Sequence, residues 1–143
     1  YHGRSYPRDA ENIYNFGENL GMAFQLQDDL LDAFGDTSKF GKEIGGDIVT
    51  NKKTFLYLKA FELADGDTLE ELTQLFQDKD VETDKKVLRI QKIYQSLGID
   101  VITQEIIEEY LNKAILYLEQ IDVDEVRKAG LRKFANEMIY REV

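Results

Sequence analysis

Three carboxylates lie close together within the apolar stretch of residues 24–34, and their spacing suits a metal site. Asp28 and Asp32 are one helical turn apart, and Asp29 lies three residues before Asp32, so a helix would bring all three to one edge. Two like charges about 4 Å apart repel by roughly 4 kcal/mol at an effective dielectric constant near 20. A cation is therefore expected beside them, and ligands that offer only oxygen favour magnesium.

A solvated helix surface is the competing interpretation, because acidic pairs near a helix end are usually exposed to water. Such a surface would continue with Glu and Lys at helical spacing. Here Leu26, Leu30, Ala33 and Phe34 cover much of the remaining circumference. This pattern favours a helix inside a bundle, and the solvated surface stays open as the alternative.

The composition of the chain predicts an all-α fold. The 143 residues include a single proline, Pro7, and the later segments are rich in Leu, Ile, Glu, Lys and Gln, which form helices well. We expect an irregular leader at residues 1–8, followed by a single helical domain at residues 9–143 that is long enough to bury a core.

Charge and residue content disfavour several classes of protein. The net charge of −10 speaks against a nucleic-acid partner or an anionic membrane surface. The absence of cysteine excludes disulfides, a thiol nucleophile and a cysteine zinc site. No apolar run has the length that a membrane span needs, and a cytoplasmic location fits these features.

Apolar periodicity predicts a series of helices separated by short turns. Asp9 is expected to cap the first helix. Ile102 and Ile106 in the next-to-last helix, and Phe134 and Ile139 in the last, are expected to face the core. The predicted helices span residues 9–34, 51–64, about 69–76, 84–97, 100–121 and 124–141, with a glycine-rich loop at 35–49.

Lysines in this loop and after it are candidates for binding an anion. Lys39 and Lys42 lie in the loop, and Lys52 and Lys53 would open the helix at 51–64. Lysines at a helix start oppose the macrodipole, and a bound phosphate would remove the conflict. An ordinary solvated lysine pair explains Lys52 and Lys53 as well, and it is favoured when they are considered alone.

Three sequence blocks occur in an order and spacing that are more specific than any one of them. They read F-Q-L-Q-D-D-L-L-D-A-F-G-D, then G-K-E-I-G-G-D-I, then N-K-K-T. With these blocks the chain resembles the polyprenyl synthetase family, the trans-prenyltransferases that make farnesyl, geranylgeranyl and longer diphosphates. The resemblance extends from about residue 10 to the end of the chain.

The resemblance implies the C-terminal part of an isoprenoid synthase helical bundle with a deep central cavity. It also implies transfer of an allylic diphosphate onto isopentenyl diphosphate, with Mg²⁺ as cofactor neutralising the charge on the leaving diphosphate. Family enzymes are usually homodimers, so a homo-oligomer is expected.

The resemblance also assigns roles to individual residues. Asp28, Asp29 and Asp32 match the family's second acidic motif, and Asp28 and Asp32 are the first candidates for direct metal contact. Asp47 matches a further acid near the metal. The remaining matches are to substrate contacts: Lys42 and Lys52 for the allylic diphosphate, Phe24 and Gln25 for the substrate cavity. Lys42 is grouped with the three acids of the motif as catalytic.

The chain departs from the family in what it lacks. Family members are much longer, and the first acidic motif and the arginines that bind isopentenyl diphosphate have no counterpart here. We therefore expect a C-terminal half that is inactive by itself. The alternatives are a magnesium-diphosphate-binding module, a half-enzyme that needs a partner chain, or a helical interaction protein in which the acidic turn is incidental.

Overall fold

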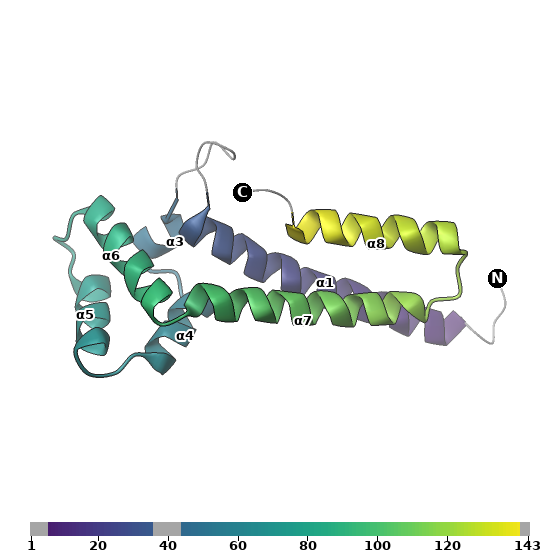
Figure 1. The fold of residues 1–143 in the computed structure, drawn as a ribbon, viewed down its shortest axis with the longest axis horizontal. Helices are drawn as coiled ribbons and strands as arrows, with labels where there is room; N and C mark the ends of the chain where they lie inside the picture. The colour runs from purple at the N-terminus through teal and green to yellow at the C-terminus, as the bar shows by residue number, and fades with distance from the viewer. Residues whose placement is uncertain (1–5, 36–43, 141–143) are drawn as a thin grey trace. The chain divides into compact units, whose positions relative to one another are not determined.

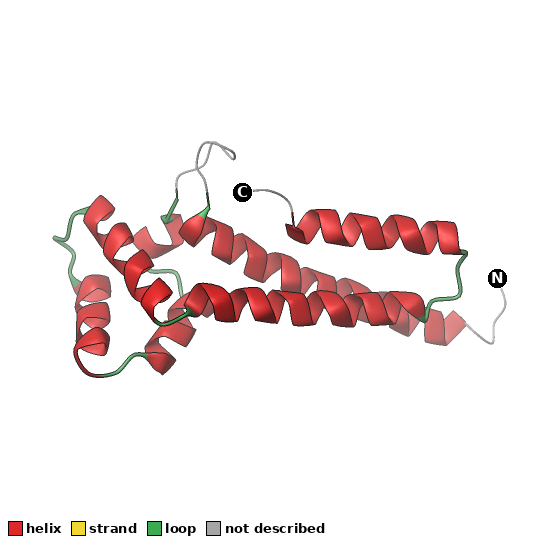
Figure 2. Ribbon diagram, viewed as in Figure 1, coloured by secondary structure: helices red, strands yellow, loops and turns green. Residues whose placement is uncertain are grey.

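The computed structural model describes residues 6–35 and 44–140, and every regular element within these ranges is a helix (Figures 1 and 2). The predicted all-α fold is confirmed. Within the described ranges, no helix combines the length and apolar character that a membrane crossing requires. The helices are α1 (Tyr6–Phe34), α3 (Gly46–Val49), α4 (Phe55–Leu63), α5 (Gly66–Gln77), α6 (Thr83–Ser96), α7 (Ile99–Glu119) and α8 (Glu125–Tyr140).

Contacts divide the chain into two compact units. The first comprises residues 1–27 and 105–142, and the second comprises residues 28–104. Helices α1 and α7 therefore each contribute one part to the first unit and the other part to the second. The single domain at 9–143 stays a prediction.

The first helix begins earlier than predicted. It starts at Tyr6 and includes Pro7, so the last three residues of the predicted leader belong to α1. Proline is tolerated there because its missing N–H would have no partner in the first turn of a helix. Asp9 does not cap the helix but lies within it, and its buried Oδ1 accepts a hydrogen bond from the Asp122 N–H at 3.2 Å. In the first unit, this bond ties the start of α1 to the connection between α7 and α8.

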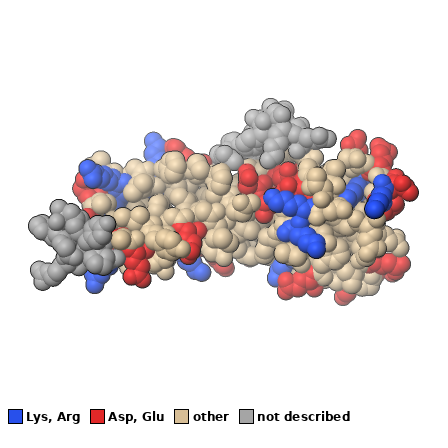
Figure 3. All heavy atoms as spheres, turned by 180° about the vertical axis from the view of Figure 1, so that it is seen from behind, with Lys and Arg blue, Asp and Glu red and all other residues tan. Residues whose placement is uncertain are grey.

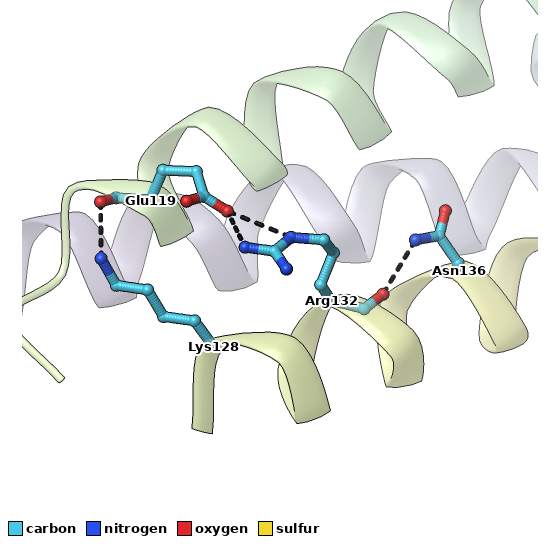
Figure 4. Close-up of polar contacts among 4 residues, drawn as sticks. All are labelled: Glu119, Lys128, Arg132 and Asn136. Atoms are coloured by element: carbon cyan, nitrogen blue, oxygen red, sulfur yellow. Dashed lines mark hydrogen bonds and ion pairs between the residues drawn. The ribbon is translucent and has the colours of Figure 1, made fainter. Parts of the chain in front are cut away.

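Polar contacts join α7 to α8 in the first unit (Figure 4). The carboxylate of Glu119 at the end of α7 accepts from the Arg132 guanidinium, with Nε at 3.1 Å. Lys128 Nζ donates to the Glu119 carbonyl at 2.8 Å. Within α8, Asn136 Nδ2 donates to the Arg132 carbonyl at 2.9 Å. A carbonyl at a helix C-terminus attracts a cation, so Lys128 also satisfies the end of α7.

The core-facing sides of α7 and α8 differ from the prediction. In α7, Ile107 is fully buried, whereas Ile106 is only partly buried. In α8, Ile139 is buried as predicted, but Phe134 is 52% exposed and Ala135 is fully buried instead. On each helix the apolar stripe is wider than the part that is buried. Periodicity alone therefore predicts the centre of the buried face about one residue away from its actual position.

The second unit has a contiguous hydrophobic core, built from the end of α1, from α3 to α6 and from the first residue of α7. Its aromatic part includes Tyr57 and Phe76, whose ring centroids are 4.9 Å apart. Gln91 Nε2 on α6 donates to the Ala33 carbonyl near the end of α1 at 2.7 Å. This core fixes the end of α1 against α6. The buried members are Ala33, Ile48, Leu56, Ala60, Ala64, Leu72, Phe76, Ile90, Ile93, Tyr94 and Ile99.

Acidic and basic side chains are interspersed on the face drawn in Figure 3. Ion pairs at the surface include Arg89 with Glu71 and Lys59 with Glu62, and in each pair at least one partner is exposed. Such pairs contribute at most about 1 kcal/mol each, so burial of apolar surface, rather than charge pairing, holds each unit together.

Candidate functional site

The acidic stretch lies in the last two turns of α1, as the sequence predicts. Asp29 and Asp32 are buried, with 8% and 7% of their surface exposed, and Asp28 is half-buried. The open alternative of a solvated acidic face therefore does not describe Asp29 and Asp32. Buried carboxylates need donors or cations nearby, because an uncompensated charge in the interior is costly.

For Asp32, the start of α3 supplies one such donor, and the contact also holds α3 in place. Its Oδ2 accepts from the Asp47 N–H at 2.8 Å, and its carbonyl accepts from the Gly45 N–H at 2.6 Å. A Cβ on Gly46 would lie 3.4 Å from Oδ1 of Asp32. Asp32 therefore satisfies donors at the start of α3, where a helix has no internal partners for its N–H groups.

The segment after α3 is a helix end and not a helix start, which corrects the prediction for residues 51–54. Asn51 has φ of 58°, its N–H bonds to the Ile48 carbonyl at 3.1 Å, and the Lys52 N–H bonds to the Asp47 carbonyl at 2.9 Å. This pair of bonds around a left-handed residue is the Schellman motif. A backbone hydrogen bond therefore links Lys52 directly to Asp47.

The next helix, α4, begins at Phe55 because Thr54 caps it. The Thr54 Oγ1 accepts from the Tyr57 N–H at 3.2 Å. Lys52 and Lys53 are exposed and precede this cap. They therefore lie outside α4 and do not place positive charge in its first turn, as the predicted helix at 51–64 implied. The missed indication was a threonine directly before an apolar run, which is an N-cap pattern.

A small cavity brings Asp29, Asp47 and Lys52 together in the second unit. Its volume is about 10 Å³, and Thr54 completes its polar lining. That volume holds about one water-sized species. The apolar wall is formed by Ala33, Ile48, Leu56 and Tyr94. Burial, with a smaller contribution from Tyr57, raises the pKa of the Tyr94 hydroxyl, so this wall carries no additional charge at neutral pH.

The acids fit a magnesium ion only as a partial set of ligands. Among the described residues, no group of three or more His, Cys, Asp or Glu is close enough to hold a metal ion. Magnesium typically keeps several waters and binds one or two carboxylates together with substrate phosphates. Asp29 and Asp47, around a cavity that holds one small species, fit that pattern.

Among the described residues, the predicted site residues Asp28, Asp32, Phe24 and Gln25 do not line this cavity. Phe24 is half-buried and Gln25 is exposed, and both belong to the first unit. Lys42 lies outside the described residues. Tyr94 on α6 also lines the cavity, and no motif in the sequence marks it as a site residue.

Comparison with known proteins supplies the family. The sequence profile of the family described as Polyprenyl synthetase matches residues 2–96 of this chain. The chain belongs to the polyprenyl synthetase family. The resemblance seen in the sequence is thereby confirmed.

Two further matches agree with the family. A short chain isoprenyl diphosphate synthase of Methanothermobacter thermautotrophicus is 28% identical over 140 residues, which is 98% of this chain and 42% of that protein. A crystal structure of a geranylgeranyl pyrophosphate synthase is 38% identical, with a TM-score of 0.85, covering 95% of this chain and 42% of the other.

A third match concerns a structure that contains ligands. The geranylgeranyl pyrophosphate synthase of Corynebacterium glutamicum, complexed with isoprenyl diphosphate and magnesium, is 28% identical with a TM-score of 0.82. The match covers 92% of this chain and 37% of that structure's chain. The chain thus spans less than half of the relatives that it matches.

Proposed function

We propose that the chain is part of a prenyltransferase that condenses an allylic diphosphate with isopentenyl diphosphate, using magnesium held by its acidic stretch. The observation that carries this proposal is the cavity where Asp29, Asp47 and Lys52 meet, in a chain of the polyprenyl synthetase family. Acids beside an exposed lysine are the groups that a magnesium diphosphate requires. The complex of a related synthase with isoprenyl diphosphate and magnesium supports the same chemistry.

The residues have distinct parts in this proposal. Asp29 and Asp47 bind magnesium together with waters, and the exposed Lys52 ammonium binds diphosphate oxygens. A cavity of about 10 Å³ is too small for a diphosphate, so the diphosphate lies at its mouth. Asp32 holds α3, and with it Asp47, in position. The bound magnesium supplies charge neutralisation at the leaving diphosphate.

A second candidate is favoured by the incomplete set of metal ligands. The described residues offer no group of three acids for a metal, and the chain covers 42% of a related synthase. We therefore propose that this chain alone binds magnesium diphosphate without transferring a prenyl group, as a binding module or as a half-enzyme with a partner chain. Measured prenyl transfer by the purified chain alone would refute this second proposal.

Calorimetry with inorganic pyrophosphate, with and without magnesium chloride, tests the site. We expect binding that depends on magnesium and that weakens by about 10-fold to 150-fold in Asp29→Asn, because losing one charged partner costs about 1.5–3 kcal/mol. Asp67→Asn, at an exposed position in the first turn of α5, is the matched control and should bind as the unaltered chain does. Binding that is indifferent to magnesium, or equal losses in both variants, would contradict the proposal.

A further inference from the structure

Lys86 on α6 is a buried lysine in the second unit. Only 7% of its surface is exposed, and within the described part of the chain no carboxylate lies at ion-pair distance from its ammonium. Burial lowers the pKa of this group. Its Nζ donates to the Asn51 Oδ1 and lies 5.2 Å from the centroid of the Phe76 ring. A methionine would fill this space without burying a charge, so packing alone does not explain a lysine here.

The partner of Lys86 is the left-handed residue of the Schellman motif after α3. Asn51 has φ of 58°, a conformation that asparagine tolerates better than most residues. Both polar atoms of its side-chain amide are bonded, because Oδ1 accepts from Lys86 and Nδ2 donates to the Phe76 carbonyl at 3.2 Å. The turn that ends α3 is therefore anchored to both α5 and α6.

This anchor lies one residue before Lys52. The Lys52 N–H bonds to the Asp47 carbonyl at 2.9 Å, and the Thr54 N–H bonds to the Lys52 carbonyl at 3.0 Å. A rotation of the backbone at Asn51 would change both bonds and would move Lys52 relative to Asp47. The conformation of Asn51 thus determines whether the two residues face the same cavity.

We propose that Lys86 and Asn51 form a clamp that positions Lys52 for the diphosphate, with Lys86 as a positioning residue that does not touch the ligand. This inference rests on the proposed function of the cavity. A glycine at position 51 would also permit the left-handed conformation, but it has no side chain to bond the turn to α5 and α6. The buried charge of the clamp selects one backbone conformation at the cost of desolvation.

The test compares Lys86→Met with Lys85→Met in the 143-residue chain. Both variants remove one charge from the same helix, and Lys85 is exposed. We expect Lys86→Met to weaken binding of magnesium pyrophosphate about tenfold, the size of loss seen when outer contacts that orient metal ligands are removed. Lys85→Met should bind as the unaltered chain does. Equal affinity in Lys86→Met and the unaltered chain would overturn the clamp.

A second measurement separates this inference from the proposed function. In NMR spectra without ligand, Lys86→Met should shift the amide signals of Lys52 and Thr54, and Lys85→Met should leave them in place. Asn51→Gly keeps the left-handed conformation but removes the link, so it should reproduce the loss of affinity even if Lys86→Met folds poorly. Unmoved Lys52 and Thr54 signals in Lys86→Met would refute the clamp. Shifted signals in a chain that binds no pyrophosphate would support the clamp and refute the proposed function.

Discussion

Among the described residues of the second unit, the charged side chains of Asp29, Asp32 and Lys86 are buried. Each is costly to bury, and for two of them the structure gives the compensating contact: the Asp47 N–H for Asp32 and the Asn51 amide oxygen for Lys86. Asp29 lines the cavity with Lys52. The charges buried among the described residues of the second unit are thus the ones that surround, or support, the residues proposed to bind magnesium diphosphate.

The pH dependence of stability reports the burial of Lys86. Because burial lowers the pKa of Lys86 below its ordinary value of 10.5, the unfolded chain binds more protons than the folded chain between the two pKa values. The free energy of unfolding therefore rises with pH through that interval. We expect the free energy of unfolding of the unaltered chain to increase relative to that of Lys86→Met as the pH approaches 10.5, measured by urea denaturation.

The same comparison removes the contribution of Tyr94, which titrates in both proteins. Burial raises its pKa, so its contribution to stability is lost at high pH and would otherwise mask the rise. A difference that stays constant throughout the interval would show that the Lys86 ammonium is not desolvated.

At the scale of elements, α3 depends on contacts outside itself. A helix of four residues cannot be stable alone, because nucleation costs more than so few bonds return. Its start is bonded to Asp32, and its end is fixed by the Schellman motif at Asn51. Gly45, directly before it, has φ of 86° and would bring a Cβ to 2.7 Å from Cγ1 of Val87. These contacts fix the backbone of α3, and the position of Asp47 therefore depends on them.

Gly45→Ala should destabilise the second unit. The left-handed backbone and the close approach to Val87 together cost about 1–3 kcal/mol. Gly130→Ala is the matched control, because the added Cβ meets nothing within 4 Å on α8 and should stabilise by up to about 1 kcal/mol. Urea denaturation measures both changes. An alanine at position 45 that left the denaturation midpoint unchanged would be inconsistent with the described turn.

At the scale of the whole molecule, apolar side chains remain exposed on the first unit. Val126 and Phe134 on α8 are 82% and 52% exposed, and Leu116 on α7 is 63% exposed. Val126 and Phe134 are eight residues apart, so they lie about 80° apart around the axis and on the same side of α8. Exposed apolar surface of this kind is typical of an interface. The relatives, of which this chain covers 42% or less, contain further segments that have no counterpart here.

We expect the chain to self-associate through this side of α8. Analytical ultracentrifugation should show a mass that rises with concentration, because association removes apolar surface from water. Replacing both residues, Val126→Lys with Phe134→Lys, should shift the chain toward monomer. Gln77→Lys, at an exposed polar position at the end of α5, is the control and should leave the association unchanged.

A single sedimenting species of monomer mass at every concentration would refute the expected association. Equal effects of Gln77→Lys and of the double replacement would show that added charge, and not the apolar side of α8, governs it.

The sequence by itself determined the all-α fold, the family, and the helix that carries Asp28, Asp29 and Asp32. These follow from local properties: helix-forming residues, apolar periodicity and the ordered motif blocks. Helix boundaries were less accurate, since Pro7 lies inside α1 and Thr54, not Asn51, marks the start of the next helix. The sequence contains the N-cap pattern at Thr54, but the predicted helix start at Asn51 also included Lys52 and Lys53.

Only the tertiary structure decided which residues meet. It placed Asp29 with Asp47 and Lys52 at one cavity, turned Asp32 toward the start of α3, and buried Lys86 against Asn51 and Phe76. The hydrogen bonds of Asp32 with Asp47 and of Lys86 with Asn51 join residues 15 and 35 positions apart in the chain. Such distant pairings are set by packing across the core, and no local propensity or spacing encodes them.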